Sequence, residues 1–237
     1  MTTTLITGAN KGLGFETARQ LIAAGHTVYA GSRDAERGRQ AADQLGAGAR
    51  LMLIDVTDDA SVEAAAKSIA ADGGLDVLVN NAGIEARTAA NGVVGTADTT
   101  ADFMRAMFDT NAFGVVRVTH AFLPLLQRSA APVIVNVSSG LGSLAQMTQA
   151  GWPAAAYPGL AYPASKAALN MITVQYAKAL PGMRVNAADP GYTDTDLNGH
   201  EGIQTVEQGA EIIVRLARLG PDGPTGGYFT AAGPVPW

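Results

Sequence analysis

The sequence predicts an α/β protein with a doubly wound parallel sheet of about seven strands and helices on both faces. Short β-branched runs alternate with alanine-rich stretches of helical periodicity along most of the 237 residues, which is the pattern of repeated strand–helix–strand units. Of these residues 47% are hydrophobic and only 16% are charged. Such a chain can bury one sizeable core, so we expect a single domain over residues 1–237.

Each expected strand is a short apolar run that ends near Gly, Asn, Asp or Ser, and each expected helix is a longer, alanine-rich run. In chain order, we expect strands at 2–7, 26–31, 50–54, 76–80, 132–137, 183–187 and 226–230. The helices between and after them are expected at 12–24, 35–45, 59–71, 101–127, 163–180 and 205–219. The strand at 132–137 is apolar on both faces, as a central strand covered by helices on each side should be.

Two long segments, at 140–161 and 191–204, interrupt this alternation. Each follows the end of an expected strand, where ligands bind in open α/β sheets. Long loops of this kind often form lids or pocket walls, so we interpret both as substrate loops. The alternative is a pair of mobile surface excursions.

Composition excludes several classes of function. The net charge is −5, without a basic cluster, which argues against a nucleic-acid partner. There is no Cys and there are only three scattered His residues, so no metal site is expected. No apolar run reaches the ~18 to 20 residues of a membrane span. The N-terminal residues lack the pattern of a signal peptide, and we expect a cytoplasmic protein.

A glycine-rich turn follows the first expected strand. Glycines allow a tight turn and a close approach to a pyrophosphate, whose charge is stabilised by the N–H groups at a helix start. The turn reads Thr7-Gly8-Ala9-Asn10-Lys11-Gly12-Leu13-Gly14. Its position directly after a strand favours a nucleotide site, although a glycine-rich turn alone is a weak signal.

Tyr162 and Lys166 lie four residues apart in an expected helix. Residues at this spacing share one helix face, and a cation beside a phenol favours the phenolate. Such a tyrosine could exchange a proton with an alcohol or a ketone. The alternative is an ordinary exposed helix turn.

The chain resembles the short-chain dehydrogenase/reductase family over about residues 4–195, in the order of its motifs. Those motifs are the Gly-x-x-x-Gly-x-Gly turn, Asp55-Val56, Asn80-Asn81-Ala82-Gly83, Asn111, Ser138-Ser139, Tyr162-Pro163-Ala164-Ser165-Lys166 and Pro190-Gly191-Tyr192-Thr193-Asp194-Thr195. The resemblance implies a single-domain Rossmann fold that binds a nicotinamide dinucleotide.

The resemblance also implies the residues that contact the cofactor. They are Gly8, Asn10, Lys11, Gly12, Leu13 and Gly14 in the turn, Asp55 and Val56 at the adenine, Asn81, Ala82 and Gly83 beneath the adenine ribose, Tyr162 and Lys166 near the nicotinamide, and Pro190, Gly191, Thr193 and Thr195 near the carboxamide. A plain turn is the alternative for 80–83. Asp194 and Asp196 are expected to be solvated or capping.

The end of the second expected strand predicts NADP(H). An acidic residue there would pair with a ribose 2′-hydroxyl, but this strand ends in Gly31-Ser32-Arg33. Arg33 is a forked cation suited to a 2′-phosphate, and Lys11 could add a second cation. We interpret Asp34 as the cap of the next helix. The alternative is that both cations are solvated.

The resemblance implies a catalytic set of Asn111, Ser139, Tyr162 and Lys166. Tyr162 would protonate a carbonyl oxygen to which Ser139 donates, while Lys166 lowers the tyrosine's pKa and binds the nicotinamide ribose. Asn111 would anchor a water that connects Lys166 to solvent, or could be only a polar bend in a helix. Ser138 competes with its neighbour for the catalytic role, but adjacent strand residues face opposite ways.

The segment between Ser139 and Tyr162 is longer than the family pattern. We expect Met147, Trp152 and Tyr157, together with Tyr192, to form a pocket wall for a hydrophobic or aromatic carbonyl compound. The predicted function is an NADP(H)-dependent reduction of a ketone, aldehyde or quinone to an alcohol, or the reverse. The alternative is a non-catalytic NADP(H)-binding redox sensor.

The apolar tail at 226–237 could cover the protein's own core or pack against a second subunit. A monomer and a homo-oligomer are therefore both left open.

Overall fold

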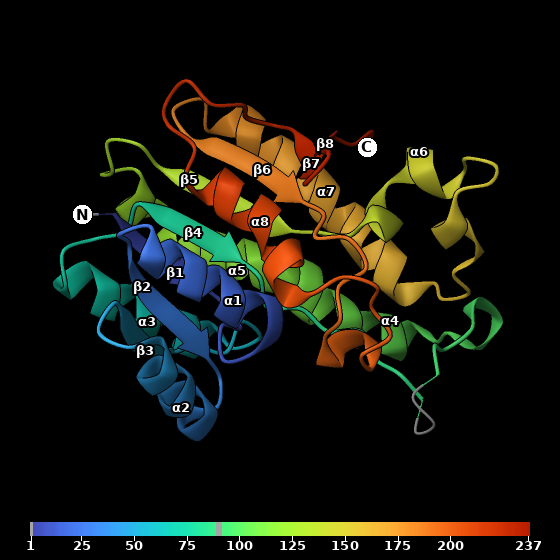
Figure 1. Cartoon of the computed structure of the whole chain (residues 1–237), viewed down its shortest axis with the longest axis horizontal. Coiled ribbons are helices and arrows are strands. Elements are labelled where there is room, and N and C mark those ends of the chain that lie inside the picture. Colours follow the sequence, from blue (N-terminus) through green and yellow to red (C-terminus); the bar gives the residue numbers. More distant parts are fainter. Residues whose placement is uncertain (1, 89–91) are drawn as a thin grey trace.

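A single eight-stranded sheet forms the centre of the protein (Figure 1), in a computed structural model that describes residues 2–88 and 92–237. The strand order is β3-β2-β1-β4-β5-β6-β7-β8. The strands are β1 Thr3–Ile6, β2 Thr27–Ser32, β3 Ala49–Leu53, β4 Val77–Asn80, β5 Val133–Val137, β6 Arg184–Ala188, β7 Tyr228–Thr230 and β8 Gly233–Pro234. All neighbouring pairs are parallel except β7 and β8. The predicted doubly wound fold is thereby confirmed. The eighth strand was not predicted, because two residues are too short to show a periodicity.

Helices follow the strands largely as expected. They are α1 Gly12–Ala23, α2 Ala35–Leu45, α3 Asp59–Ala71, α4 Ala101–Phe108, α5 Gly114–Leu126, α6 Leu144–Met147, α7 Ala161–Ala179 and α8 Val206–Ala217. Short 3₁₀ turns lie at Thr96–Asp98, Gly140–Gly142, Pro153–Ala156 and Asp196–Asn198. Asp34 caps α2, as predicted, because its carboxylate accepts from the N–H of Arg37 at 2.9 Å.

Two helix predictions need correction. The single helix expected at 101–127 is divided by a π-helical turn, Asp109–Phe113, between α4 and α5. Helix α7 begins at Ala161, two residues earlier than expected, since Pro163 is tolerated in the first turn, where an N–H has no helical partner. Tyr162 therefore belongs to the first turn of α7.

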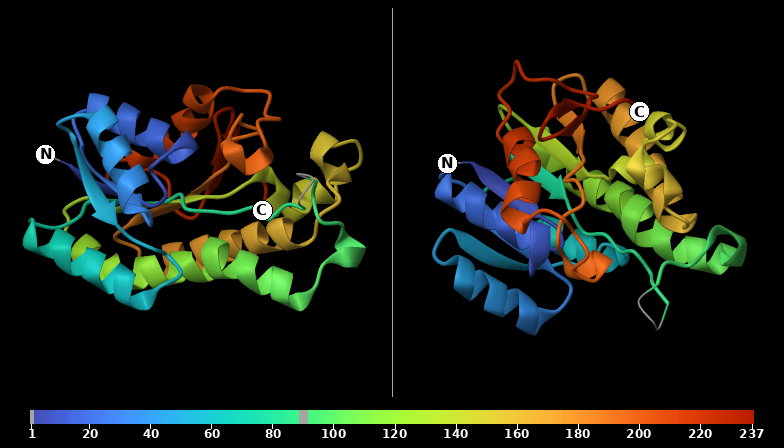
Figure 2. Two further views of the ribbon diagram at one scale, coloured as in Figure 1. Left: turned by 90° about the horizontal axis from the view of Figure 1, so that it is seen from below. Right: turned by 45° about the vertical axis from the view of Figure 1, so that its right-hand side comes forward.

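The helices form one layer on each face of the sheet (Figure 2). Helices α3, α5 and α7 pack on one face, where Leu5, Leu78 and Ile134 point from β1, β4 and β5. Helices α1 and α8 cover the opposite face, which the alternate strand residues, such as Ile6 and Val135, provide. This alternation follows from the period of two in a strand. All five residues of β5 are buried, which confirms its predicted central position.

The segments after β4 and β5 are tied to one another at the carboxyl edge of the sheet. Gly95 pairs with Gly159 in an isolated β-bridge, and the N–H and hydroxyl of Thr96 both donate to the Pro158 carbonyl, at 2.9 and 2.8 Å. Both predicted substrate loops lie at this edge. The 140–161 loop is not irregular throughout, because it contains α6 and two 3₁₀ turns.

The C-terminal tail packs on its own chain. The Trp237 ring stacks on Tyr228 with 5.3 Å between ring centroids. The Trp237 carbonyl accepts from the N–H of Ala145, and the Pro236 carbonyl accepts from the Ser143 hydroxyl. The tail therefore supports the start of the 140–161 loop. No helix within 2–88 and 92–237 is long and apolar enough to cross a membrane.

Candidate active site

Ser139 and Tyr162 meet at the carboxyl edge of the sheet. Ser139 follows β5 and Tyr162 lies in the first turn of α7, and the Ser139 side chain is near enough to the phenol to lower its pKa. The neighbouring Ser138 points elsewhere, because its hydroxyl donates to Oδ1 of Asn170 at 2.6 Å. The structure thus brings together Ser139 and Tyr162, and it directs Ser138 into the contact between β5 and α7.

The Tyr162 hydroxyl is held in its protonated form. Burial raises the pKa of Tyr162 above its usual range, and the negative charges of Glu85 and Asp189 raise it further, while the hydrogen bond with Ser139 acts in the opposite direction. We expected Lys166 to lower this pKa. In the structure the pKa of Tyr162 is raised, because burial and the two carboxylates dominate.

Lys166 is buried beneath Tyr162. Its Nζ donates to the Val137 carbonyl at 2.8 Å and lies 5.6 Å from the centroid of the Tyr162 ring. Burial lowers the pKa of Lys166 to about 8, whereas the charge of Asp189 opposes this shift. The predicted i, i+4 arrangement is present, but the ammonium is anchored on a backbone carbonyl.

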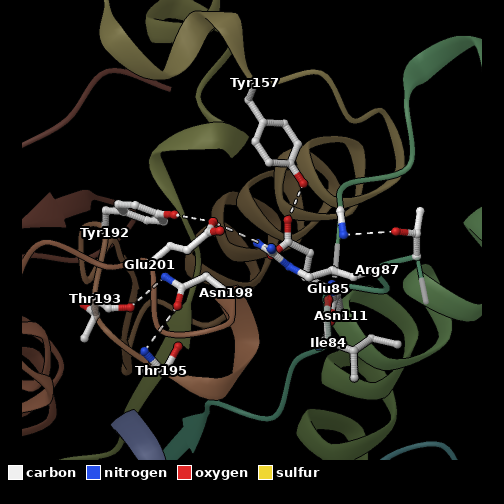
Figure 3. Close-up of polar contacts among 12 residues, drawn as sticks. Ile84, Glu85, Arg87, Asn111, Tyr157, Tyr192, Thr193, Thr195, Asn198 and Glu201 are labelled. Carbon is white, nitrogen blue, oxygen red and sulfur yellow. Dashed lines mark hydrogen bonds and ion pairs between the residues drawn. The ribbon is translucent and has the colours of Figure 1, made fainter. Parts of the chain in front are cut away.

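Asn111 lies in the π-helical turn and joins it to the segment after β4. Its Oδ1 accepts from the Ile84 N–H at 2.9 Å, while its Nδ2 donates to the Ile84 carbonyl at 2.9 Å and to Ser165 Oγ at 3.0 Å (Figure 3). A Cβ on Gly83 would lie 3.4 Å from Asn111 Oδ1 and 3.6 Å from Lys166 Nζ. Asn111 and Lys166 therefore flank the same glycine. The water between them stays a prediction.

The glycine-rich turn has the geometry of an anion site. Gly8 has a φ of +65°, and a Cβ on Gly14 would lie 2.4 Å from the Gly8 carbonyl oxygen. The Asn81 side chain fixes this turn by donating to the carbonyls of Thr7 and Gly8 at 2.9 and 3.0 Å. Helix α1 begins at Gly12 with no side-chain cap and no acidic residue in its first turn. Its N–H groups are therefore suited to a phosphate, so these residues fit a dinucleotide.

The two predicted 2′-phosphate cations differ in their surroundings. Arg33 is exposed at the end of β2, close enough for its charge to act on Asp55. Burial raises the pKa of Asp55, but hydrogen bonds from Thr57 and the charge of Arg33 outweigh burial and lower it. Lys11 instead pairs with Asp196 at 2.5 Å. Val56 is buried beside this site, where its side chain packs against Gly114.

The 191–204 loop folds back over the glycine-rich turn. The Thr195 methyl group lies 3.7 Å from where a Cβ on Gly12 would be. The Thr193 N–H, expected near a carboxamide, donates to the Gly191 carbonyl at 3.0 Å, and Pro190 accepts from Gln204. Asp194 and Asp196, which we expected to be solvated or capping, both contact His200, at 2.6 and 2.8 Å.

A small pocket lies beside Tyr162. Its lining residues are Glu85, Ala86, Val93, Val94, Phe103, Met107, Tyr157, Gly159, Ala161 and Tyr162. Of the four residues predicted for the substrate wall, Tyr157 lines this pocket and Met147 does not. Trp152 packs near Gly140, and Tyr192 is 48% exposed.

Sequence reasoning missed two carboxylates of this site. Glu85 lines the pocket, and Asp189 is buried beside Gly140 and Gly191. Glu85 follows β4 and Asp189 follows β6, and these two strands are the neighbours of β5 in the sheet. That position was the available signal, because ligands meet α/β sheets at their carboxyl edge. Among the residues that the structure describes, no His, Asp and Glu cluster could hold a metal.

The parallel sheet carries a glycine-rich turn after its first strand and has Ser, Tyr and Lys at the same edge. This combination defines the fold and site of a nicotinamide-dependent oxidoreductase. A sequence profile of the short chain dehydrogenases matches residues 2–205. The chain belongs to the short-chain dehydrogenase/reductase family.

Relatives cover almost the whole chain. A short-chain dehydrogenase named anuI from Penicillium roqueforti is 39% identical over 91% of this chain and 88% of its own length. A (+)-neomenthol dehydrogenase from Capsicum annuum is 31% identical over 95% of this chain and 94% of its own length.

Solved structures show the same fold. The NADPH-bound carbonyl reductase from chicken fatty liver has a TM-score of 0.85 and 27% identity, covering 100% of this chain and 99% of that one. A 3-ketoacyl-(acyl-carrier-protein) reductase from Brucella melitensis, complexed with NADH, has a TM-score of 0.82 and 26% identity, covering 97% and 96%.

Proposed function

We propose that this protein is an NADP(H)-dependent oxidoreductase that reduces a ketone, aldehyde or quinone to an alcohol, or catalyses the reverse reaction. The observation that carries the proposal is the placement of Ser139 beside Tyr162, whose ring lies 5.6 Å from the Nζ of the buried Lys166. The related carbonyl reductase and neomenthol dehydrogenase support a carbonyl or alcohol as the reacting group.

Tyr162 is suited to be the acid of the reduction. Because burial and neighbouring carboxylates raise its pKa, the phenol keeps its proton at neutral pH until a stronger base, the oxygen of a carbonyl that is being reduced, lies beside it. Ser139 would donate a second hydrogen bond to that oxygen. The protonated Lys166 would stabilise the phenolate that Tyr162 leaves behind. The nicotinamide, when bound, supplies the hydride.

NADP(H) is the cofactor that the residues around Arg33 favour. Ser32 precedes it where an acidic residue would select NAD, and Arg33 presents an exposed guanidinium for a 2′-phosphate. Gly8, Gly12 and Gly14, with the open start of α1, would hold the pyrophosphate. One structural relative contains NADPH and another NADH, so the preference rests on this chain's own residues.

The proposal is tested by NADPH consumption with a panel of ketones, aldehydes and quinones. We expect Tyr162→Phe to lower kcat/KM by a factor of about 10² to 10⁴, which is the usual contribution of a positioned acid. The variant should still bind NADPH. Tyr176→Phe on the same helix is the matched control and should retain activity. A redox sensor would instead bind NADPH and be inert in all three forms, which would exclude the enzyme.

A further inference from the structure

Charged and phenolic side chains form a cluster around Glu85 and Arg87 (Figure 3). Two of its members, Glu85 and Tyr157, line the pocket beside Tyr162. Glu85 Oε2 accepts from Arg87 Nη2 at 3.0 Å and from its Nε at 3.3 Å, while Oε1 accepts from the Tyr157 hydroxyl. Arg87 Nη1 also lies 3.9 Å from Glu201, which accepts from the Tyr192 hydroxyl at 3.4 Å. Two segments thus meet at the buried Glu85 carboxylate, and the 191–204 loop joins the cluster through Arg87.

The carboxylate of Glu85 lines the pocket, whereas the guanidinium of its partner Arg87 does not. Glu85 is the single ionised residue among the described residues that line the pocket, and Arg87 is absent from that lining. The side chain of Glu85 is only 7% exposed, so water screens its charge weakly. The remaining lining residues are apolar or phenolic. A substrate group placed here would therefore experience a negative potential.

Two backbone bridges fix the segments on either side of the cluster. Arg87 pairs with Val93 in a β-bridge, and the bridge between Gly95 and Gly159 holds the Tyr157 segment against the same strand-like stretch.

The cluster combines two carboxylates with one guanidinium, which leaves one net negative charge. Since the Glu201 side chain is 63% exposed, that carboxylate is mostly compensated by solvent.

If the pocket opened to admit a substrate, the Glu85 carboxylate would need another hydrogen-bond donor. The cavity beside Tyr162 is only about 10 Å³, whereas pockets for small ligands usually span about 300 to 1,000 Å³. Outward movement of Tyr157 would enlarge it and would leave Glu85 without the phenol's hydrogen bond. A buried carboxylate that loses a donor is destabilised. A hydroxyl or ammonium group of the substrate can replace that donor, but an anionic group cannot.

We propose that Glu85 selects the substrate by charge: the site accepts neutral or cationic carbonyl compounds and rejects those with a carboxylate or phosphate near the carbonyl. This inference rests on the proposed carbonyl reduction. Burial raises the pKa of Tyr157, Tyr162 and Tyr192, and the charge of Glu85 adds to each of these rises, which is consistent with the proposal. A purely structural Glu85 would tie the loops together without distinguishing substrates.

The test uses three ketones of one frame: 4-acetylbenzamide, 4-acetylbenzoate and 4-(aminomethyl)acetophenone, which are neutral, anionic and cationic. Both kcat/KM with NADPH and Kd in the presence of NADP⁺ are measured. We expect the wild type to disfavour the anionic ketone relative to the neutral one by about tenfold or more, a ratio that a single unit charge in a partly buried site produces.

Two variants should move this anionic-to-neutral ratio in opposite directions. Glu85→Gln removes the charge and should raise the ratio about tenfold, while Arg87→Gln removes the compensating cation and should lower it. Glu63→Gln, which changes an exposed carboxylate on α3, should leave both the ratio and the activity unchanged. Circular dichroism confirms that each variant is folded.

The outcomes separate the two proposals. An unchanged ratio in Glu85→Gln overturns the charge selection even if the neutral ketone is reduced, and so does a wild type that binds all three ketones equally. Absence of turnover with every ketone would count against the proposed function alone, since the Kd ratios still decide the role of Glu85.

Discussion

Asp189 lies between Lys166 and the two loops at 140–161 and 191–204. Its Oδ1 accepts from the Gly191 N–H at 3.0 Å, and its Oδ2 lies 3.0 Å from where a Cβ on Gly140 would be. Gly140 and Gly191 begin the 140–161 and 191–204 loops. The side chain therefore ties the bases of both loops together while placing a negative charge near Lys166, whose pKa it raises against the effect of burial.

This arrangement predicts a pH dependence. With a pKa of about 8, Lys166 is protonated below pH 8 and loses its charge above it. Since the proposed role of this cation is to stabilise the phenolate of Tyr162, kcat/KM for reduction should fall as pH rises through about 8. Asp189→Asn removes the anion that raises the pKa of Lys166, so the fall should move to lower pH by roughly one unit.

A pH–rate profile from pH 6 to 10 measures this shift. Asp43→Asn, at an exposed position on α2, is the charge-matched control and should have the wild-type profile. A fall that moves to higher pH, or that stays in place in Asp189→Asn, would contradict the assigned role of Asp189.

Arg33 carries the cofactor prediction at the residue scale. Arg33→Ala should weaken NADPH binding by roughly tenfold to a hundredfold, the value of a charge-assisted hydrogen bond, and should affect NADH much less. Arg39→Ala, at an exposed position on α2 paired with Glu36, serves as the control. Equal losses for the two cofactors in a titration would show that Arg33 does not bind the 2′-phosphate.

The residues of the candidate site were largely predictable, but the contacts that form the pocket were not. Ser139, Tyr162 and Lys166 lie in short motifs whose order along the chain is characteristic. Glu85 and Tyr157 are 72 positions apart, and nothing local relates them. Their contact depends on how two segments lie over the sheet edge, which periodicity does not determine.

At the scale of elements, the π-helical turn is the main departure from prediction. An apolar period of 3.6 continues through 101–127, so one helix was expected. The turn at Asp109–Phe113 has one additional residue per turn, which is a frequent feature of functional sites. It directs Asn111 toward Ile84, where the amide satisfies both a backbone N–H and a carbonyl.

Asn111→Ala should therefore destabilise the fold as well as the site. It would leave the N–H and carbonyl of Ile84 without this partner, and we expect a loss of about 1 to 3 kcal/mol in the free energy of unfolding. Urea denaturation measures it. Gln149→Ala in the exposed part of the 140–161 loop is the control. A variant as stable as the wild type would show that water replaces the amide without cost.

At the scale of the whole molecule, one sheet edge gathers everything that the proposed reaction needs. The glycine-rich turn after β1, the pocket wall after β4, Ser139 after β5 and Asp189 after β6 come from four separate strands. Parallel strands place these ends together whatever their separation in sequence, which explains why the general site location could be predicted. The tail and the eighth strand could not, because their stability comes from contacts such as the stacking of Trp237 on Tyr228.

Transfer of deuterium from NADPH labelled at C4 tests the central claim most directly. NADPH carrying deuterium on one or the other face is incubated with 4-acetylbenzamide, and the alcohol is analysed by mass spectrometry. We predict that the wild type gives labelled alcohol from one of the two labelled forms, and that Tyr162→Phe gives almost none while still binding NADPH. Two results would contradict the assignment of Tyr162 as the acid of a carbonyl reduction. One is that Tyr162→Phe labels the alcohol at the same rate as the wild type, and the other is that the wild type labels no alcohol across the carbonyl panel.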